Sequence, residues 1–406
     1  MLAWIAPLIV FGLVVFVHEL GHFLAAKAVG VYAPRFSIGF GPALLKRRIG
    51  ETEYVLALLP LGGYVRMASR EDESMALIEG GGEKPREEIA TTGANAAGKT
   101  VDDHAGAPAP DRDWDPEAMY PFGPKPVPEH RWFESKSLPA RLLILIAGVA
   151  MNVLLTFVVA TGVIASYGWP YRAAVIDSVI AGRPAAAAGL QRGDSVVAVN
   201  GTSVRTWNEL VDRIRPASGQ ALTLDVVRDG RPRRLVVSPV ATSTSNPSTG
   251  MAERVGQIGA APRAQVLRDR VGVGEAIVLG GRATVDMATN VVTVVRGLFA
   301  GEVDASNLGG PVAIAQTSVE AARNGVESLL TLIAFLSINI AIMNMLPIPV
   351  LDGGQILINL LEGIKGSAFS TRTREYILRT GVVAVLLLFA FVMYNDIRAL
   401  LAKVLG

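Results

Sequence analysis

The chain carries near its start the run LAWIAPLIVFGLVVFVHELGHFLAAKAV (residues 2–29), in which His18, Glu19, His22 and Lys27 interrupt an otherwise apolar sequence. About 20 apolar residues in a helix cross the hydrocarbon core of a bilayer. The run therefore predicts a membrane-spanning helix. A signal peptide is the alternative, but a basic stretch before the run is missing and the polar residues lie inside its apolar part.

Three further apolar runs lie later in the chain and predict three more spans. The four predicted transmembrane helices occupy residues 1–30, 136–167, 327–354 and 376–396. The last has a short apolar centre and needs its flanking residues, or a thinner bilayer, to cross. The predicted fold class is therefore a multi-span α-helical membrane protein.

The composition agrees with this prediction and removes several other classes. Of the 406 residues, 50% are hydrophobic and 18% are charged, which excludes a disordered chain. The 38 Lys and Arg residues against 36 Asp and Glu give a net charge of +2, so we expect no nucleic-acid partner. Cysteine is absent from the sequence, which excludes disulfides, thiolate metal ligands and a cysteine nucleophile.

The distribution of Lys and Arg indicates which connections face the cytoplasm. Basic residues gather in residues 35–70, after the first predicted span, and in residues 365–379, before the fourth. Short connections with this bias stay in the cytoplasm. The segment between the second and third spans is therefore predicted to lie outside. Its own basic residues weigh little, because long translocated domains largely ignore the charge rule.

The first cytoplasmic connection has two parts. Residues 31–68 alternate apolar and polar side chains between glycines, which predicts short strands in a β-hairpin element. Residues 69–135 are rich in Gly and Pro and carry seven Lys and Arg against fifteen Asp and Glu, a net charge of −8. This composition predicts a flexible acidic loop.

The segment predicted to lie outside, between the second and third spans, also consists of distinct parts. Residues 173–241 combine strand-like runs, helical patches and Asn-Gly and Asp-Gly turns, which is typical of a small α+β domain. Residues 242–250 have the composition of a Ser/Thr/Pro linker. The remainder, residues 251–326, contains at 271–299 an amphipathic pattern too polar for a span, which suits an interfacial helix or one packed on the domain.

The first predicted span contains the sequence His18-Glu19-Leu20-Gly21-His22. Residues four apart share one face of a helix, so both imidazoles can reach one metal ion. The carboxylate of Glu19 lies beside them, where it can take a proton from an attacking water. Such a motif occurs by chance in soluble proteins, but ionisable side chains inside a membrane span are costly and normally functional. A pair of polar residues satisfied by neighbouring helices is the alternative.

The third predicted span ends in NMLPIPVLDGG (residues 344–354). Pro347 and Pro349 stop the helix, and the two glycines permit a sharp turn. Unwound backbone at membrane depth is tolerated where it is buried in protein or lines a wet cavity, which would hold Asp352 beside a polar pocket. The alternative is a helix that simply ends at the membrane surface with Asp352 in water.

The predicted depths bring the two motifs together. His18 lies 14 residues beyond Trp4, roughly 21 Å along a helix, and Asp352 lies 23 residues beyond Leu329, under roughly 35 Å. Both positions fall in the cytoplasmic half of the bilayer. Two histidines, one aspartate and a water make an open catalytic zinc site. We therefore predict a metal-dependent hydrolase that works inside the membrane.

These motifs together resemble the site-2 protease family of intramembrane zinc metalloproteases, and most closely its bacterial regulator-of-sigma-E protease type. Residues 31–68 are similar to the membrane-reentrant β-loop of that group. Residues 173–241 resemble one PDZ domain, through AGLQRGD (188–194) and VNG (199–201). Asn307-Leu-Gly-Gly-Pro311 also matches a family segment.

The resemblance implies a role for each matching residue. Zn²⁺ would be held by His18, His22 and Asp352, and Glu19 would be the general base. Substrate contacts would come from the side chain of Asn344 and from the β-loop, which would pair with an unwound substrate strand. The residues expected in these substrate contacts are Asn344, Gly39, Gly41, Gly62, Gly63 and Tyr64.

The resemblance also implies a biological setting. The protein would be a multi-pass protease of the bacterial inner (cytoplasmic) membrane, with its PDZ-like domain on the periplasmic side. Its partners would be the lipid bilayer and single-span membrane proteins. These substrates would be an anti-sigma factor after a first cleavage, and leftover signal peptides.

Two features depart from the family pattern, and two other functions stay open. Val149 follows Gly148 where the family leads us to expect proline, and there is one PDZ-like domain where the best-known members carry two. A catalytically silent scaffold is one alternative, although it would have no need of Glu19. The other is a membrane zinc peptidase that cuts outside the bilayer, with its third metal ligand in the acidic loop.

Overall fold

The computed structural model describes residues 2–69, 115–245, 252–303 and 309–405. Most of the predicted acidic loop, residues 70–114, lies outside the described residues. Within the described parts, four helices are long and apolar enough to cross a membrane. This finding supports the prediction of a membrane protein. The four stretches are Ala3–Ala28, Leu138–Tyr167, Val326–Asn344 and Arg372–Ala402.

The fourth of these helices is much longer than its apolar centre. Helix α10 runs over Thr371–Leu405, whereas the sequence predicted a short span over 376–396. Large apolar side chains on this helix are exposed, with Leu387 at 67% and Phe389 at 52%. A patch of this kind is rare on the surface of a soluble monomer and fits a helix that contacts lipid.

The chain forms two compact units, each assembled from distant stretches of sequence. One combines residues 5–152 and 343–385 and is called the α1 unit. The other combines residues 1–4, 153–342 and 386–406 and is called the PDZ-like unit. Each unit is described separately.

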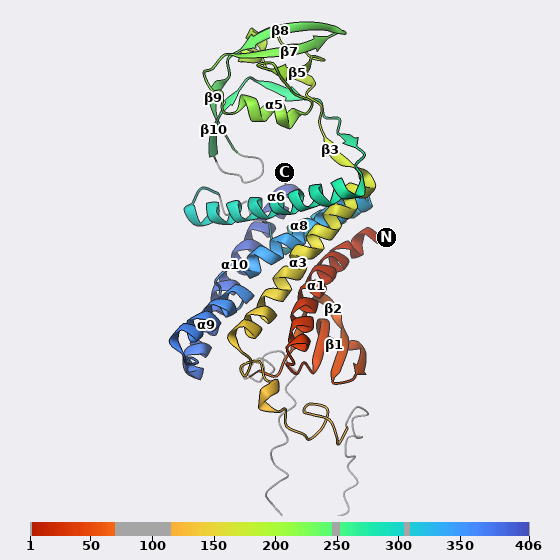
Figure 1. The fold of residues 1–406 in the computed structure, drawn as a ribbon, viewed down its shortest axis with the longest axis vertical. Helices are drawn as coiled ribbons and strands as arrows, with labels where there is room; N and C mark the ends of the chain where they lie inside the picture. Colours follow the sequence, from red (N-terminus) through yellow and green to blue (C-terminus); the bar gives the residue numbers. More distant parts are fainter. Residues whose placement is uncertain (1, 70–114, 246–251, 304–308, 406) are drawn as a thin grey trace, which may run out of the picture. The chain divides into compact units, whose positions relative to one another are not determined.

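In the α1 unit, helix α1 (Ala6–Ala28) packs beside an antiparallel pair of strands, β1 (Arg35–Ile49) and β2 (Thr52–Arg66) (Figure 1). Aromatic rings join the helix to the strands, since the ring centroid of Phe36 lies 5.1 Å from that of Phe23. Apolar burial between α1 and the strands therefore places this β element against the helix that carries both histidines.

The two strands form a wider sheet than a simple hairpin. Residues 35–38 pair with residues 53–56 on one side and with residues 63–66 on the other. Each strand must bend near its middle to allow this pairing. The bends contain glycines with positive φ, which side chains rarely adopt: +90° at Gly39 and Gly41 and +133° at Gly62.

The end of the predicted acidic loop is ordered, unlike the flexible segment that its composition suggested. The guanidinium group of Arg131 donates two hydrogen bonds to the carboxylate of Glu51, at 2.7 and 2.8 Å. The backbone N–H of Tyr32 donates to the carbonyl of Arg131 at 2.9 Å. A bidentate ion pair and backbone hydrogen bonds to the residues that flank the sheet therefore offset the unfavourable composition of this stretch.

Helix α3 (Leu138–Tyr167) runs without a break through Ala147-Gly148-Val149, where the family pattern led us to expect a proline. It packs closely on α1. A Cβ atom at Gly21 would lie 2.3 Å from the carbonyl oxygen of Ala147. Small residues at such a crossing let two helix backbones approach each other within a membrane.

Helix α8 (Val326–Asn344) ends before the two prolines, and α9 (Asp352–Lys365) begins at the aspartate of the motif. The sequence placed residues 327–354 in one span, and the structure divides them between these helices and their connection. A Cβ atom at Gly353 would lie 2.3 Å from the carbonyl oxygen of Met345, so the turn between the helices accepts only glycine there. The turn places Asp352 in the first turn of α9.

The PDZ-like unit contains a four-stranded sheet of order β6-β5-β7-β8. Helix α5 (Trp207–Ile214) begins with a capping box, in which the Thr206 side chain accepts from the N–H of Glu209 and the Glu209 carboxylate accepts from that of Thr206. Leu210 and Leu224, both 0% exposed, belong to the core. The strands are β5 (Ser195–Val199), β6 (Thr202–Ser203), β7 (Leu222–Arg228) and β8 (Arg231–Val237).

This domain extends beyond residue 241, the boundary predicted from the sequence. Strand β4 (Ile176–Val179) pairs with β11 (Ala260–Pro262), and β9 (Val240–Ser245) pairs with β10 (Ala252–Gln257). The prediction of a linker over 242–250 is therefore wrong for residues 242–245. The Ser/Thr composition suggested a linker, but β-branched threonine alternates with serine in these residues, and this pattern suits a strand. Residues 246–250 lie outside the described residues.

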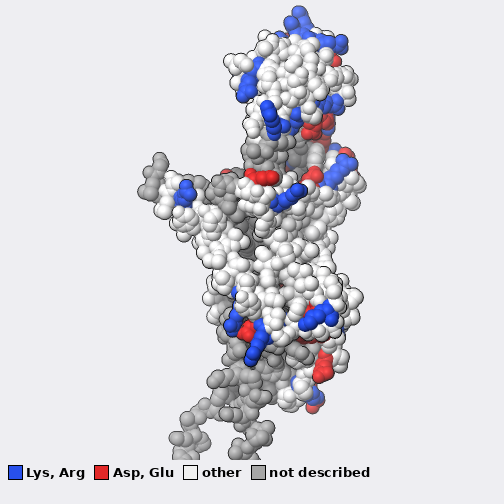
Figure 2. Space-filling view, turned by 90° about the vertical axis from the view of Figure 1, so that its left-hand side faces the viewer, with Lys and Arg blue, Asp and Glu red and all other residues white. Residues whose placement is uncertain are grey.

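Figure 2 shows Lys and Arg side chains at several places on the surface of the PDZ-like domain.

The remaining short elements of this unit complete the domain and its connection. Helix α4 (Pro184–Ala187) contributes Ala185 to the core. Strand β3 (Trp169–Tyr171) pairs with β12 (Leu267–Asp269).

Helix α6 (Val273–Ala300) occupies the segment in which the sequence predicted an amphipathic helix. Its buried face carries small residues at a spacing of four: Ala276, Gly280 and Thr284. A Cβ atom at Gly280 would lie 2.1 Å from the hydroxyl oxygen of Thr161, so α6 packs tightly on α3. The shorter helix α7 (Pro311–Arg323) follows, and its N-terminus is capped by the carboxylate of Asp396.

Candidate metal centre

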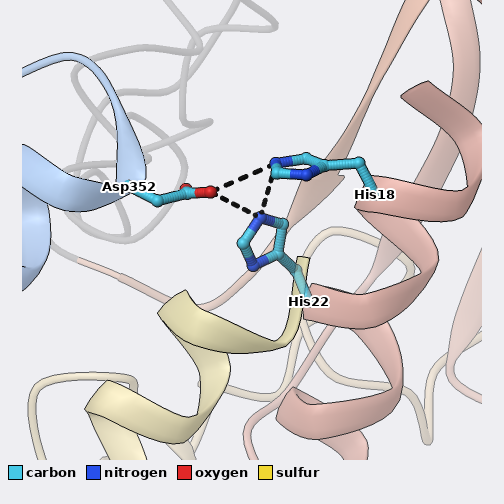
Figure 3. Close-up of side chains that lie close together, drawn as sticks. All are labelled: His18, His22 and Asp352. Carbon is cyan, nitrogen blue, oxygen red and sulfur yellow. Dashed lines mark hydrogen bonds and ion pairs between the residues drawn. The ribbon is translucent and has the colours of Figure 1, made fainter. Parts of the chain in front are cut away.

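Three side chains from α1 and α9 converge on one point of the α1 unit (Figure 3). The Nε2 atoms of His18 and His22 lie 3.1 Å apart. The Oδ2 atom of Asp352 lies 3.1 Å from Nε2 of His18 and 3.4 Å from Nε2 of His22. The histidines are 6% and 7% exposed, so the cluster is shielded from bulk solvent.

The local structure explains why these atoms meet. His18 and His22 are four residues apart on α1 and therefore share one face. Asp352 is the first residue of α9, where the helix N-terminus favours a negative charge. The chain can turn so sharply before this residue because Gly353 and Gly354 leave room for the backbone of the preceding turn.

The donor set fits a divalent metal ion. One ligand atom from each of the three residues lies within 4.8 Å of the others. The Oδ2 atom of Asp352 is buried and has no hydrogen-bond partner among the described residues, although it points at two imidazole nitrogens. Two imidazoles and a carboxylate are the donor set of a catalytic zinc site, in which three protein ligands hold the ion.

Helix α3 forms a second wall of this site, which the sequence did not predict. The Nδ1 atom of His22 donates to the carbonyl oxygen of Ile144 at 2.8 Å, which directs Nε2 at the cluster. A Cβ atom at Gly148 would lie only 2.4 Å from Nε2 of His22. The Asn152 side chain reaches His18 at 3.3 Å. The spacing of four between these residues is the signal that could have suggested one shared helix face.

Glu19 lies between the cluster and strand β2. It follows His18 directly in α1 and is half-buried. A Cβ atom at Gly63 would lie 3.4 Å from Cγ of Glu19 and 2.7 Å from the carbonyl oxygen of Ser37. The Glu19 side chain therefore lies against the backbone of β2, and the residue before it, His18, belongs to the cluster. A general base for water attack on a bound peptide needs such a position.

The structure places the predicted substrate-binding residues in two groups. The Nδ2 atom of Asn344 lies 3.2 Å from Nε2 of His18 and so adjoins the cluster, whereas Gly63 lies beside Glu19. The others lie at or beside the bends of β1 and β2, where the rings of Tyr64 and Phe40 stack with centroids 6.2 Å apart. These others are Gly39, Gly41, Gly62 and Tyr64.

A charged cluster holds α9 in place further along its length. Glu362, which is 4% exposed, accepts hydrogen bonds from Arg374 at 2.8 and 3.0 Å. Arg141 of α3 donates to Asn359 at 2.9 Å. Burial alone would raise the pKa of the Glu362 carboxyl, but the Arg374 guanidinium and the N–H of Phe369 hold it below its ordinary 4.5. The helix that carries Asp352 is thus anchored by ion pairs.

Comparison with known proteins gives matches over nearly the whole chain. The sequence profile described as Peptidase family M50 matches residues 6–388. The zinc metalloprotease RasP of Bacillus licheniformis is 31% identical, with 98% of this chain and 99% of the relative aligned. The regulator of sigma-W protease RasP of Bacillus subtilis is 30% identical over 98% of each chain. The protease RseP of Yersinia pestis is 30% identical over 97% of this chain and 98% of the relative.

Among solved structures, the PDZ domain of an SdrC-like protein from Listeria innocua matches 23% of this chain and 96% of its own length, at 17% identity and a TM-score of 0.19.

Proposed function

Because the chain belongs to Peptidase family M50, the site-2 protease family, and is a metalloprotease, we propose that it uses zinc to hydrolyse peptide bonds in or near the transmembrane segment of single-span membrane proteins. The observation that carries this proposal is the cluster of His18, His22 and Asp352, two of whose members lie in a helix of membrane-spanning length. Polar groups at that depth are costly and are kept for a function.

His18, His22 and Asp352 would hold the zinc ion, which would act as a Lewis acid toward the scissile carbonyl. The carboxylate of Glu19 accepts a proton from the attacking water and returns it to the leaving amine. Burial of the cluster between α1, α3 and α9 restricts the water that reaches it, which strengthens electrostatic interactions within the site. A site of this kind performs hydrolysis although lipid surrounds the helices.

The substrate must be unwound before it is cut, because the carbonyl groups of a transmembrane helix are already hydrogen-bonded and shielded. The neighbouring strand β2 offers a backbone to which an unwound segment can pair as an added strand. Gly63 keeps that edge close to Glu19, since it carries no side chain. The amide of Asn344 is within reach of the same space and would bind the substrate backbone.

The charge distribution and the names of the relatives support a biological setting. The excess of Lys and Arg around the β element and at the start of α10 supports an inner-membrane protein of bacteria whose PDZ-like domain faces the periplasm. A relative is named as a regulator of sigma-W protease. We therefore infer that the substrates are single-span proteins of the anti-sigma-factor kind, admitted after a first cleavage, and remnant signal peptides.

The test is a cleavage assay with the purified full chain in lipid nanodiscs and a tagged single-span substrate. Wild type is expected to cut the substrate within or next to its apolar segment, and Glu19→Gln is expected to leave it intact while binding zinc as wild type does. Equal cutting by both proteins would contradict the role of Glu19. A cut that maps to a soluble part of the substrate would support a membrane zinc peptidase acting outside the bilayer. A zinc-loaded wild type that cuts no single-span substrate would favour a silent scaffold.

A further inference from the structure

Helix α3 presents three residues at a spacing of four to the histidine pair of α1. Ile144, Gly148 and Asn152 lie on one face of the helix, since residues i, i+4 and i+8 are stacked along it. Ile144 contacts His22, Asn152 contacts His18, and Gly148 lies between them. All five residues belong to the α1 unit.

The central glycine makes the other two contacts possible. A Cβ atom at Gly148 would lie 2.4 Å from Nε2 of His22 and 2.9 Å from Cε1 of His18. Both distances are shorter than a side chain tolerates, so the rings occupy the space that a larger residue would fill. The Nδ1 atoms of both imidazole rings can therefore reach α3.

A histidine that binds a metal through Nε2 needs a hydrogen-bond acceptor for its other ring nitrogen, Nδ1. A neutral imidazole that offers the lone pair of Nε2 to a metal carries its proton on Nδ1, and this N–H needs an acceptor. At His22 the requirement is met by the carbonyl oxygen of Ile144, at 2.8 Å. The same requirement applies to Nδ1 of His18.

Asn152 is placed to meet it. Its side chain is 0% exposed, and its amide lies 3.3 Å from Nδ1 of His18 through Nδ2. A half-turn of the amide group presents Oδ1 to the same nitrogen without moving the backbone. Because Nδ1–H of a metal-bound His18 is a donor, the amide oxygen is the end that makes a hydrogen bond in the loaded enzyme.

We propose that Asn152 is a positioning residue of the metal centre, whose amide oxygen accepts a hydrogen bond from Nδ1–H of His18 and so holds Nε2 toward the metal. The pair formed by Ile144 and Asn152 thus sets the tautomer and the ring orientation of both histidines. This inference rests on the proposed zinc site and names the residue outside the ligand set that the site depends on.

The test measures zinc affinity of the full chain in nanodiscs by competition with a chromogenic chelator. Asn152→Leu keeps the volume and removes the acceptor, and Asn152→Asp keeps an acceptor. Thr156→Val is the matched control, since Thr156 is one turn further along α3, is also 0% exposed and donates to the carbonyl oxygen of Ala334. We expect Asn152→Leu to bind zinc about 10- to 100-fold more weakly, and Asn152→Asp and Thr156→Val to bind within about threefold of wild type or more tightly.

Several outcomes would overturn the inference. Wild-type affinity in Asn152→Leu would show that His18 needs no acceptor there. Equal losses in Asn152→Leu and Asn152→Asp, or an equal loss in Thr156→Val, would show that packing of α3 and not hydrogen bonding is responsible. If Asn152→Leu does not fold, Asn152→Asp decides alone: a tenfold weaker affinity contradicts the inference and an equal or tighter one supports it.

A second readout is the visible spectrum of the Co²⁺-substituted proteins. The ligand-field bands of Asn152→Leu should shift because His18 changes its orientation, whereas those of Thr156→Val should match wild type. A failure of the proposed zinc site is distinguishable, because it would appear as a wild-type protein that binds neither metal, and a failure of the proposed proteolysis would appear as a metal-loaded wild type that cuts no substrate.

Discussion

Gly148 of α3 faces His22 of α1 so closely that a Cβ atom at Gly148 would lie 2.4 Å from the Nε2 atom of that histidine. The glycine lies in the interior of a 30-residue helix, where it costs about 1 kcal/mol relative to alanine. Helix propensity therefore does not account for it. The space that it leaves is taken by the imidazole rings of the metal centre.

The substitution Gly148→Ala should therefore damage the site although it favours the helix. The added methyl group must push His22 or α3 away, so we expect zinc affinity to fall at least tenfold and proteolysis to fall with it. Chelator competition and a substrate-cleavage assay measure the two effects.

Gly162→Ala is the matched control for this substitution. Gly162 lies in the same helix, and among the described residues no atom lies within 4 Å of the position of its added Cβ. This variant should keep zinc affinity and activity. If Gly148→Ala binds zinc as Gly162→Ala does, the close approach of α3 is not required by the metal centre.

The edge of β2 beside Glu19 gives a second prediction. A side chain at Gly63 would meet the carbonyl oxygen of Ser37 at 2.7 Å and Cγ of Glu19 at 3.4 Å. Gly63→Val should therefore push β2 away from β1 beside Glu19, displace the edge to which a substrate strand would pair and lower kcat/KM by about tenfold or more, while zinc stays bound because the ligands are untouched. Activity and zinc content are measured on the same preparation. Loss of zinc together with activity would show that the effect passes through the metal centre instead of through the strand edge.

The third prediction concerns the PDZ-like domain and pH. Burial would raise the pKa of the Asp194 carboxyl, but hydrogen bonds from Arg228 and from the N–H of Gln191 hold it below its ordinary 3.8. The carboxylate makes 2.7 Å hydrogen bonds with both Nε and Nη2 of Arg228. Because the folded pKa is the lower one, this pair stabilises the domain above pH 3.8, and the stabilisation is lost as pH falls through the folded value.

Hydrogen exchange of the β7 amides in the full chain checks this prediction at a series of pH values. Protection in wild type should fall, after correction for intrinsic exchange rates, as pH drops below about 4. Asp194→Asn should be less protected at pH 7 and should lack that drop. A drop of equal size in Asp194→Asn would assign the pH dependence to another group.

The parts of the site that depend on residues close together in the sequence could be predicted. The parts that depend on packing between distant segments could not. The pairing of His18 with His22 depends only on the helical repeat of four residues. Asp352 was predicted because prolines and glycines around it define a helix end, and the structure brings it to the histidines. Gly148 and Asn152 were not predicted as site residues, because their role depends on which helix packs against α1, and no local pattern contains that information.

The same distinction between local sequence and long-range contacts explains where the observed fold differs from the predicted one. The Ser/Thr composition of residues 242–245 suggested a linker, but their partner strand β10 lies beyond the intervening residues, and pairing with it makes them a strand. Likewise, Arg131 belongs to a stretch with a flexible composition, and the stretch is ordered by Glu51, which is 80 residues earlier in the chain. Contacts between distant segments override local composition in both cases.

The central claim is that His18, His22 and Asp352 bind one zinc ion, and the most direct test is the zinc content of the purified full chain. Wild type should retain about one zinc per chain after dialysis against a weak chelator, and Asp352→Ala should retain less than about a tenth, because two histidines alone leave the site incomplete. Asp396→Ala, which changes a buried aspartate that caps α7, serves as the control and should keep its zinc. A wild-type protein without zinc, or an Asp352→Ala protein that retains it fully, would contradict the account.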